Sequence, residues 1–418
     1  MDQPAKLDEQ LFRQQSARLV AALTRLFGVH NLQLVEDVVQ DAFSRALELW
    51  QERGVPENPT AWLTTAAKHR ALDLLRRERT ARTFAPELGR LLDSEWTLPA
   101  LLEEAFSAPT IRDEQLRMML SCCHPRLPEE ARLALILNVL CGFGAREIAE
   151  ALLSSQAAIE KRIARGKQAL AAQRRLFDLT HADFEPRSQT VRRALYLLFS
   201  EGYHGASPAA VQSELCHEAL RLALLLCEYP PAATPTSFAL CALMSLQAAR
   251  LPARLDASGE LCPFLEQDRS RWDARLVALG LSYFERSAAG NELSQYHTEA
   301  AIAATHASAA AVADTDWHGI VSLYDRLLSI APSPVAALNR AIAIGQRDGP
   351  TQGLAALGAI EQAERLSGYP FYAAAFGELE RRRGELGAAS AHYERALSLA
   401  RNEPERRFLR RRLAFCGS

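Results

Sequence analysis

The chain has 418 residues, a formal net charge of −2 and 48% hydrophobic residues, which is the composition of a globular protein of roughly three domains. No apolar run is long enough to span a bilayer, and the N-terminus lacks the cationic start and apolar stretch of an export signal. The eight cysteines form no CxxC pair, so we expect reduced thiols in a cytoplasmic protein. Ala, Leu, Glu and Arg dominate and alternating strand patterns are missing, which predicts an all-α fold.

Two amphipathic helices are predicted first, over residues 8–27 and 34–50. Gly28 is a plausible C-cap of the first helix. The second has an acidic patch near its start, which includes Glu36 and Asp37. Acidic residues at this end complement the helix dipole. They are equally suited to docking a basic partner, so both interpretations stay open.

A strongly basic helix follows over residues 58–82, NPTAWLTTAAKHRALDLLRRERTAR. Trp62, Leu63 and further apolar residues recur at helical spacing on one face. The other faces carry Lys68, Arg70, Arg76, Arg77, Arg79 and Arg82. One apolar stripe and one cationic face suit contact with a phosphate backbone, although a solvated basic helix has the same pattern.

Residues 83–112 contain Pro86, Pro99 and Pro109 among frequent acidic residues, and they predict a linker with short helices. Its charge is opposite to that of the basic helix. We hypothesise that it shields that helix when nucleic acid is absent.

A second compact module is predicted over residues 113–178. A short helix at 145–152, a turn at 153–155 and a cationic helix at 156–172 form a helix-turn-helix pattern, whose second helix enters the major groove. Ser154 or Ser155 is placed to N-cap that second helix. Its predicted surface carries Glu160, Lys161, Arg162, Arg165, Gly166 and Lys167.

The stretch SCCHP, residues 121–125, has residue types that ligate zinc. Neighbouring Cys122 and Cys123 point in different directions on a helix, and a tetrahedral site needs a fourth ligand. We therefore predict a packed helix end and no metal.

Residues 185–418 predict a helical extension with tetratricopeptide-like repeats. Gly377, Ala389, Tyr393 and Ala396 occupy the small and aromatic positions of the last repeat, and Tyr324 and Pro332 close a weaker copy. The extension also holds Glu201, His204, Cys216 and His217. Because no catalytic motif accompanies these four residues, we interpret them as scaffold residues and predict no catalytic residue.

The order of these modules resembles a bacterial sigma factor of the extracytoplasmic-function type, in the subgroup with a long C-terminal extension. VEDVVQDAFSRAL is similar to the polymerase-docking segment of that family, and NPTAWLTTAAKHRALDLLRRE to its promoter-melting segment. GFGAREIAEALLSSQAAIEKRIARGKQAL is similar to its upstream-element reader. The resemblance implies two small helical domains at 1–82 and 113–178, an acidic linker at 83–112 and a helical regulatory domain at 185–418.

The implied function is to direct core RNA polymerase to promoters, with no enzyme activity or cofactor of its own. The implied partners are the β′ clamp and β flap of the polymerase, promoter DNA and a protein regulator at the C-terminal domain, with no membrane. Polymerase contacts are assigned to Glu36, Asp37, Gln40 and Phe43. DNA contacts are assigned to Trp62, Lys68, His69, Arg70, Arg76, Arg77, Arg79, Gln156, Lys161, Arg162, Arg165 and Lys167.

The chain departs from the family pattern at His69, where Asn is frequent, at Gly144, which replaces a hydroxyl cap, and at Ala158, which replaces Thr or Ser. The base preference therefore does not transfer. Two alternatives stay open: a helix-turn-helix regulator that binds DNA by itself, and an enzyme with a pocket in the C-terminal half.

Overall fold

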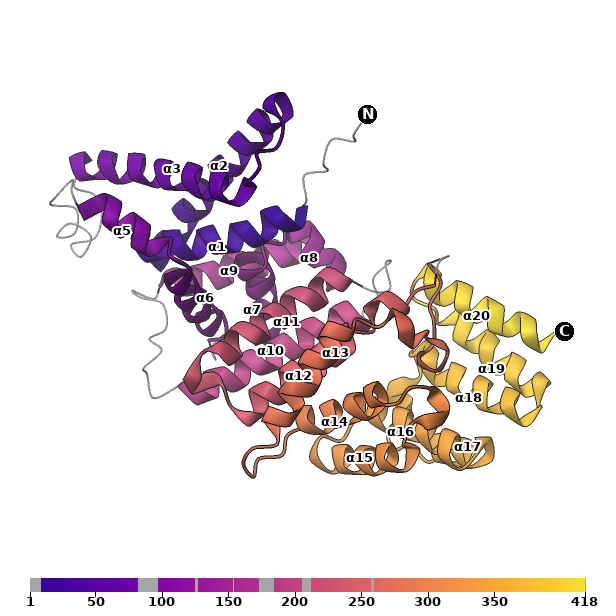
Figure 1. The fold of residues 1–418 in the computed structure, drawn as a ribbon. Coiled ribbons are helices and arrows are strands. Elements are labelled where there is room, and N and C mark those ends of the chain that lie inside the picture. Colours follow the sequence, from indigo (N-terminus) through magenta and orange to yellow (C-terminus); the bar gives the residue numbers. More distant parts are fainter. Residues whose placement is uncertain are drawn as a thin grey trace. The chain divides into compact units, whose positions relative to one another are not determined.

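The computed structural model describes residues 9–81, 97–124, 127–152, 154–172, 184–204, 212–256 and 259–417. These residues form helices and turns without a strand, apart from one isolated antiparallel bridge between Leu255 and Leu261 (Figure 1). The all-α prediction is confirmed. The chain divides into two compact units, Met1–Ala194 and Leu195–Ser418, and the division falls inside helix α10 (Phe184–His204).

The first unit contains both modules that the sequence predicts to be separate domains, together with the first part of α10. Its other elements are α1 (Glu9–Phe27), η1 (Val29–Asn31), α2 (Leu32–Arg53), α3 (Pro59–Ala81), α5 (Thr97–Ala105), α6 (Ala108–Cys122), α7 (Glu129–Leu135), the short π-helix η2 (Ile136–Leu140), α8 (Ala145–Ala151) and α9 (Gln156–Ala171).

The predicted helix boundaries follow from local chemistry. Gly28 ends α1 with a φ of 78°, and its N–H donates to the Thr24 carbonyl at 2.9 Å. Apolar stripes on α2 and α3 face each other, and Trp50 meets Trp62 edge-on with ring centroids 5.5 Å apart. Figure 1 shows these two long helices as neighbours in the first unit. Their pairing leaves the cationic faces of α3 outside the shared core.

The helix-turn-helix pattern is present as α8 and α9. Ser155 is the N-cap of α9, and its hydroxyl accepts from the Ala158 N–H at 3.3 Å. Gly144 has no capping side chain, but its own N–H donates to Glu147 Oε2 at 2.7 Å at the start of α8. Glu147 thus stabilises the start of α8 in part, as a hydroxyl N-cap does in other helices.

Gly166 corrects one expectation. The sequence pattern places it on the surface of α9, but it is buried against Leu135 of α7. A Cβ at this position would lie closer than 3.0 Å to three side-chain carbons of Leu135. The glycine is therefore what lets α9 approach α7 so closely.

The second unit contains the remainder of α10 and the helices that follow it. These are α11 (Ser213–Glu228), η3 (Pro230–Ala232), α12 (Pro235–Ala248), η4 (Leu251–Ala253), η5 (Phe264–Glu266), η6 (Arg269–Arg271), α13 (Ala274–Ser287), α14 (Gln295–Ser308), η7 (Val312–Asp314), α15 (Trp317–Ile330), α16 (Pro334–Arg347), α17 (Pro350–Gly358), η8 (Ala363–Leu366), α18 (Pro370–Arg383), α19 (Leu386–Ser398) and α20 (Glu403–Cys416).

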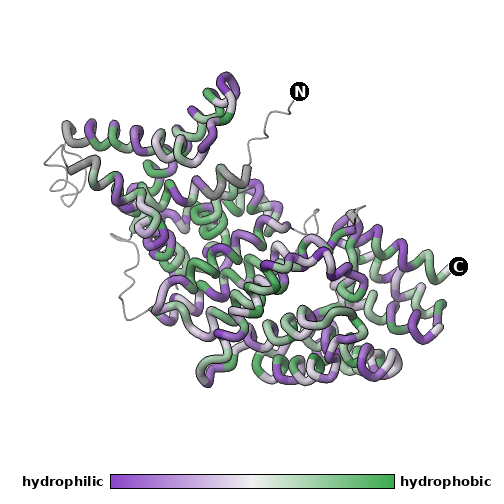
Figure 2. The backbone as a smooth tube through the Cα atoms, in the orientation of Figure 1, coloured by the Kyte–Doolittle hydropathy of each residue, from purple (hydrophilic) through white to green (hydrophobic). Residues whose placement is uncertain are grey.

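Neighbouring helices of the second unit pack on one another in sequence order. Hydrophilic and hydrophobic stretches alternate along them, as expected for helices that each bury one face (Figure 2). Tyr393 of α19 is 1% exposed. The absence of a side chain at Gly377 makes room for its ring, which a Cβ there would approach to 3.0 Å. The small and aromatic residues of the last predicted repeat thus lie at a helix–helix contact.

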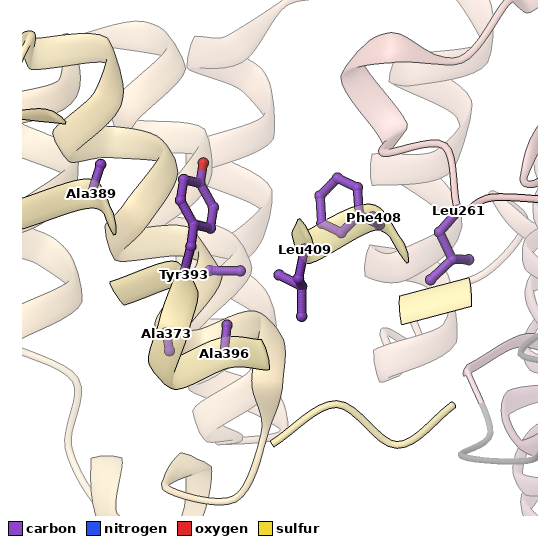
Figure 3. Close-up of a cluster of buried hydrophobic side chains, with 8 residues drawn as sticks. Leu261, Ala373, Ala389, Tyr393, Ala396, Phe408 and Leu409 are labelled. Atoms are coloured by element: carbon purple, nitrogen blue, oxygen red, sulfur yellow. The ribbon is translucent and has the colours of Figure 1, made fainter. Parts of the chain in front are cut away.

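A segment between α12 and α13 takes part in the core formed by the last helices. Leu261 packs in one cluster with Phe408 and Leu409 of α20 and with Tyr393 (Figure 3). In the described part of the chain, no helix is long and apolar enough to cross a membrane, and no three potential metal-ligating side chains come together.

Candidate nucleic-acid interface

An ion pair joins the acidic start of α2 to α9, the second helix of the helix-turn-helix pattern. Glu36 Oε1 is 2.6 Å from Lys167 Nζ, and both side chains are 23% exposed. The two residues are 131 positions apart in the sequence. The predicted polymerase-docking residue and a predicted DNA-binding residue therefore pair with each other within the first unit.

The other predicted docking residues have different environments. Asp37 and Gln40 are exposed, and Asp37 receives a long hydrogen bond of 3.5 Å from Gln33 Nε2. Phe43 is half-buried and meets Phe12 edge-on, with ring centroids 5.2 Å apart. The aromatic ring is thus held by α1, while the polar residues face outward.

A cleft of about 480 Å³ separates this part of α2 from the turn before α8. Glu36, Gln40 and Phe43 line the cleft together with residues of α1. The cleft is also lined by Asn138, Val139, Gly142, Phe143, Gly144 and Glu147. Three of the four predicted docking residues therefore share a cleft with residues at and just before the helix-turn-helix.

Two cations of α3 are paired with nearby carboxylates. Lys68 Nζ lies 2.7 Å from Glu103 Oε1 of α5 and 5.4 Å from the ring centroid of Phe106. Arg70 Nε lies 2.9 Å from Asp41 Oδ2 of α2. The contact with Glu103 is of the kind expected if the acidic linker shields the basic helix.

The remaining predicted residues of α3 differ in exposure. His69 and Arg76 are exposed, and Trp62 is half-buried against Trp50. Arg77 and Arg79 belong to α3, but their side chains lie outside the described part of the structure, and Arg82 lies outside the described residues altogether.

Helical geometry divides the predicted residues of α9 into two sets. Lys161 and Arg165 are exposed, one turn apart on the side away from the buried residues Ile159 and Ile163, and neither forms an ion pair with a described residue. Gln156 is also exposed, and its Nε2 donates to Glu160 at 2.8 Å.

The second set flanks the packed face of α9. Arg162 is 29% exposed and forms an ion pair with Glu130 of α7. Lys167 is held by Glu36. Lys161 and Arg165 therefore present their charges to solvent, whereas the charges of Arg162 and Lys167 are paired with carboxylates.

Sequence reasoning missed the partners and the supporting contacts of these side chains. Glu103 and Glu130 each stand beside a second glutamate, Glu104 and Glu129, so nothing in the sequence distinguishes which of the two is the partner. Gly166 did carry a signal, because glycine inside a helix is unfavourable unless close packing requires it.

Helix α6 anchors this unit with buried polar groups. Glu114 is 5% exposed and lies 3.4 Å from Arg25 of α1. Burial raises the pKa of the Glu114 carboxyl despite Arg117 and Arg25. At the end of α6, Cys122 and Cys123 are fully buried, and burial raises the pKa of Cys123 to about 12. Neutral, buried thiols fit the packed helix end predicted for this stretch.

In the second unit, the titratable residues near the start of the extension are spread over helix faces. The thiol of Cys216 is buried, with its Sγ 3.7 Å from the Phe199 carbonyl oxygen, and burial raises its pKa to about 12. Glu201 is half-buried near Arg401, and burial raises the pKa of its carboxyl. These environments suit a packed scaffold.

Comparison with known proteins gives three family matches. Residues 11–81 match sigma-70 region 2, residues 117–170 match sigma-70 region 4, and residues 187–288 match a family of unknown function, DUF6596. An uncharacterized protein of Rhizobium meliloti (strain 1021) is 37% identical over 398 residues, which are 94% of this chain and 92% of that protein. No solved structure matches the chain.

Proposed function

This chain belongs to the sigma-70 family, as a sigma factor of the extracytoplasmic-function type with a long C-terminal extension, and on that premise we propose how its surfaces divide the work. A sigma factor of this family binds core RNA polymerase and promoter DNA and takes part in transcription initiation. The chemistry of RNA synthesis belongs to the polymerase. What remains to be assigned is which surface of this chain meets which partner.

In this proposal, α2 contacts the β′ clamp through Glu36, Asp37, Gln40 and Phe43. Acidic and amide groups around one aromatic ring suit a basic helical partner, because the charges guide the encounter and the ring supplies apolar contact area. The part of the chain that matches region 4 contacts the β flap. The exposure of Asp37 and Gln40 supports the assignment of α2 to the β′ clamp.

The basic helix α3 meets the downstream promoter element and the opened strand. Its cations track phosphates, and Trp62 supplies a ring on which an unpaired base stacks. In the second module, α9 meets the upstream element with Gln156, Lys161 and Arg165, and with Arg162 and Lys167 once their carboxylate partners are displaced.

The observation that carries this function is the pairing of the two family matches with a helix-turn-helix whose cations lie on its outer face. Lys161 and Arg165 are spaced one turn apart and point away from the core of the unit. Exposed cations alone are also found on a solvated helix that binds no ligand. In this chain the helix follows a segment that matches sigma-70 region 2, and that combination favours DNA binding.

The second unit, Leu195–Ser418, regulates this activity in our proposal, either by masking the DNA-binding modules or by contacting polymerase or a further protein. Its stacked helices resemble a tetratricopeptide scaffold, which offers an extended surface for protein contacts. A chain that ends after Ala194 keeps the part of α10 that belongs to the first unit. If promoter-directed transcription by this shortened chain equals that of the full chain, the regulatory role is wrong.

The main test is reconstitution. The purified chain is mixed with core polymerase, and transcription is measured from a library of promoter sequences. We expect co-purification with core polymerase and transcription from a restricted subset of the library. Tight, sequence-specific binding to duplex DNA by the chain alone, with no association with polymerase, would instead identify a stand-alone helix-turn-helix regulator.

A further inference from the structure

The ion pair between Glu36 and Lys167 joins two surfaces that need different partners. Both oxygens of the Glu36 carboxylate lie close to Lys167 Nζ, at 2.6 and 2.8 Å. Each side chain is 23% exposed, so the pair is better protected from water and salt than a fully solvated one. While it is intact, the carboxylate is unavailable to a basic protein surface and the ammonium is unavailable to a phosphate.

The cleft around the ion pair involves other predicted docking residues besides Glu36. Gln40 and Phe43 line the same 480 Å³ cleft as Glu36, and so do Phe143 and Glu147. A partner helix, about 10 Å in diameter with its side chains, that docks on Glu36, Gln40 and Phe43 competes for this cleft with the residues of the helix-turn-helix part. Three of the four predicted docking residues therefore share a cleft with the helix-turn-helix part of the unit, while Asp37 stays exposed outside it.

From this geometry we propose that the first unit is self-inhibited in the free chain and that Glu36–Lys167 is its latch. This inference rests on the proposed function, because it assigns polymerase to one side of the latch and DNA to the other. A basic group of the polymerase takes the place of Lys167 at Glu36, and a DNA phosphate takes the place of Glu36 at Lys167. Either partner frees the residue that the other needs.

The latch makes the two binding steps cooperative. Opening the cleft for polymerase releases Lys167 for DNA, so a chain already bound to polymerase no longer has to break the pair when it meets a promoter. Because coupling between binding sites is reciprocal, DNA increases the affinity for polymerase by the same factor. The closed unit thereby keeps the chain off DNA until polymerase is present.

Zero-length carbodiimide cross-linking of the full chain tests the geometry, because it joins a carboxylate and an amine only when they are in contact. We expect peptide mapping by mass spectrometry to find a Glu36–Lys167 link in the free chain and to lose it when core polymerase is added. Absence of the link in the free chain, or its persistence in the polymerase complex, would overturn the proposal.

Lys167→Gln tests the energetics. The association rate of the full chain with core polymerase is measured without DNA, so any role of Lys167 on phosphates does not enter. Breaking the latch raises the population of the open form, and we expect association about fivefold faster than for the wild type. Arg146→Gln is the matched control, since it removes a cation and an exposed ion pair with Glu150 from the neighbouring helix α8. Its association rate should equal the wild-type rate.

The outcomes separate the latch from the proposed function. A wild-type chain that does not bind core polymerase contradicts the proposed function itself. A wild-type chain that binds, with Lys167→Gln binding at the same rate, leaves the sigma-factor role intact and refutes the latch. Thermal unfolding of Lys167→Gln shows whether the variant is folded in either case.

Discussion

Gly166 gives the sharpest test of how α9 is held, and Gly166→Ala is the smallest change that probes it. Alanine is favoured over glycine by about 1 kcal/mol inside a helix, so helix propensity alone predicts stabilisation. The new methyl group, however, would lie closer than 3.0 Å to three side-chain carbons of Leu135, which is fully buried. Overpacking of this kind costs about 1–3 kcal/mol. We expect a net loss of about 1 kcal/mol in the stability of the first unit.

Denaturant unfolding and amide hydrogen exchange of α9 measure this loss. Gly387→Ala is the matched control, because Gly387 lies in α19 and a Cβ added there would meet nothing within 4 Å. That variant should be neutral or more stable. If Gly166→Ala is as stable as Gly387→Ala relative to the wild type, the close contact between α9 and α7 is not what requires the glycine.

A double-mutant cycle identifies the cause. Leu135→Ala alone should destabilise the unit by about 2–5 kcal/mol, because it leaves a cavity. The clash with Leu135 is the expected reason why Gly166→Ala loses stability. If so, the double variant with Gly166→Ala and Leu135→Ala should be at least as stable as Leu135→Ala alone. Equal costs in both backgrounds would show that the two sites do not interact.

Three further outcomes are expected. Asp37→Lys should weaken association with core polymerase by about tenfold without changing the unfolding temperature, since Asp37 is exposed; unchanged association would mean that the docking patch is misassigned. Lys161→Ala should reduce the salt dependence of promoter binding by the polymerase complex by about one unit of slope, because an exposed cation on the outer face of α9 contacts a phosphate in our proposal; an unchanged slope argues against that contact. Burial raises the pKa of Glu299 to about 7, although Tyr196 donates a hydrogen bond to it. The folded chain therefore binds a proton that the unfolded chain releases, so stability should fall as pH rises from about 4.5 to 7; Glu299→Gln should flatten this fall in thermal unfolding, and an unchanged slope would refute the shifted pKa.

Much of the first unit was predictable because its elements are fixed by local signals. Gly28 ends α1 and Ser155 begins α9 as the capping rules require. The apolar stripes of α2 and α3 indicated their inward faces by spacing alone. In the C-terminal half, helix periodicity predicted the helices, and the burial of Tyr393 beside Gly377 agrees with the small and aromatic pattern.

Long-range pairing was not predictable from one sequence. The exposed acidic patch expected on α2 includes Glu36, which is instead half-buried because a lysine 131 positions away meets it. Lys161 and Lys167 have the same chemistry and lie on the same helix, yet one faces solvent and the other a carboxylate. That difference depends on how α9 packs against its neighbours, and periodicity does not specify which neighbour carries a charge.

The internal pairs affect how binding to DNA should respond to salt. Some cations already have a carboxylate partner, as Arg70 has in Asp41. Such a cation contributes less to the salt dependence of DNA binding than a solvated cation does. When such a cation moves onto a phosphate, it leaves its carboxylate unpaired, and that carboxylate attracts cations from solution, whereas a solvated cation such as Lys161 leaves no carboxylate behind. A solvated cation should therefore contribute more to the slope of promoter affinity against salt concentration than a paired cation does. A sequence rich in Lys and Arg overstates the electrostatic affinity of this chain, because part of its positive charge is engaged in holding its own modules together.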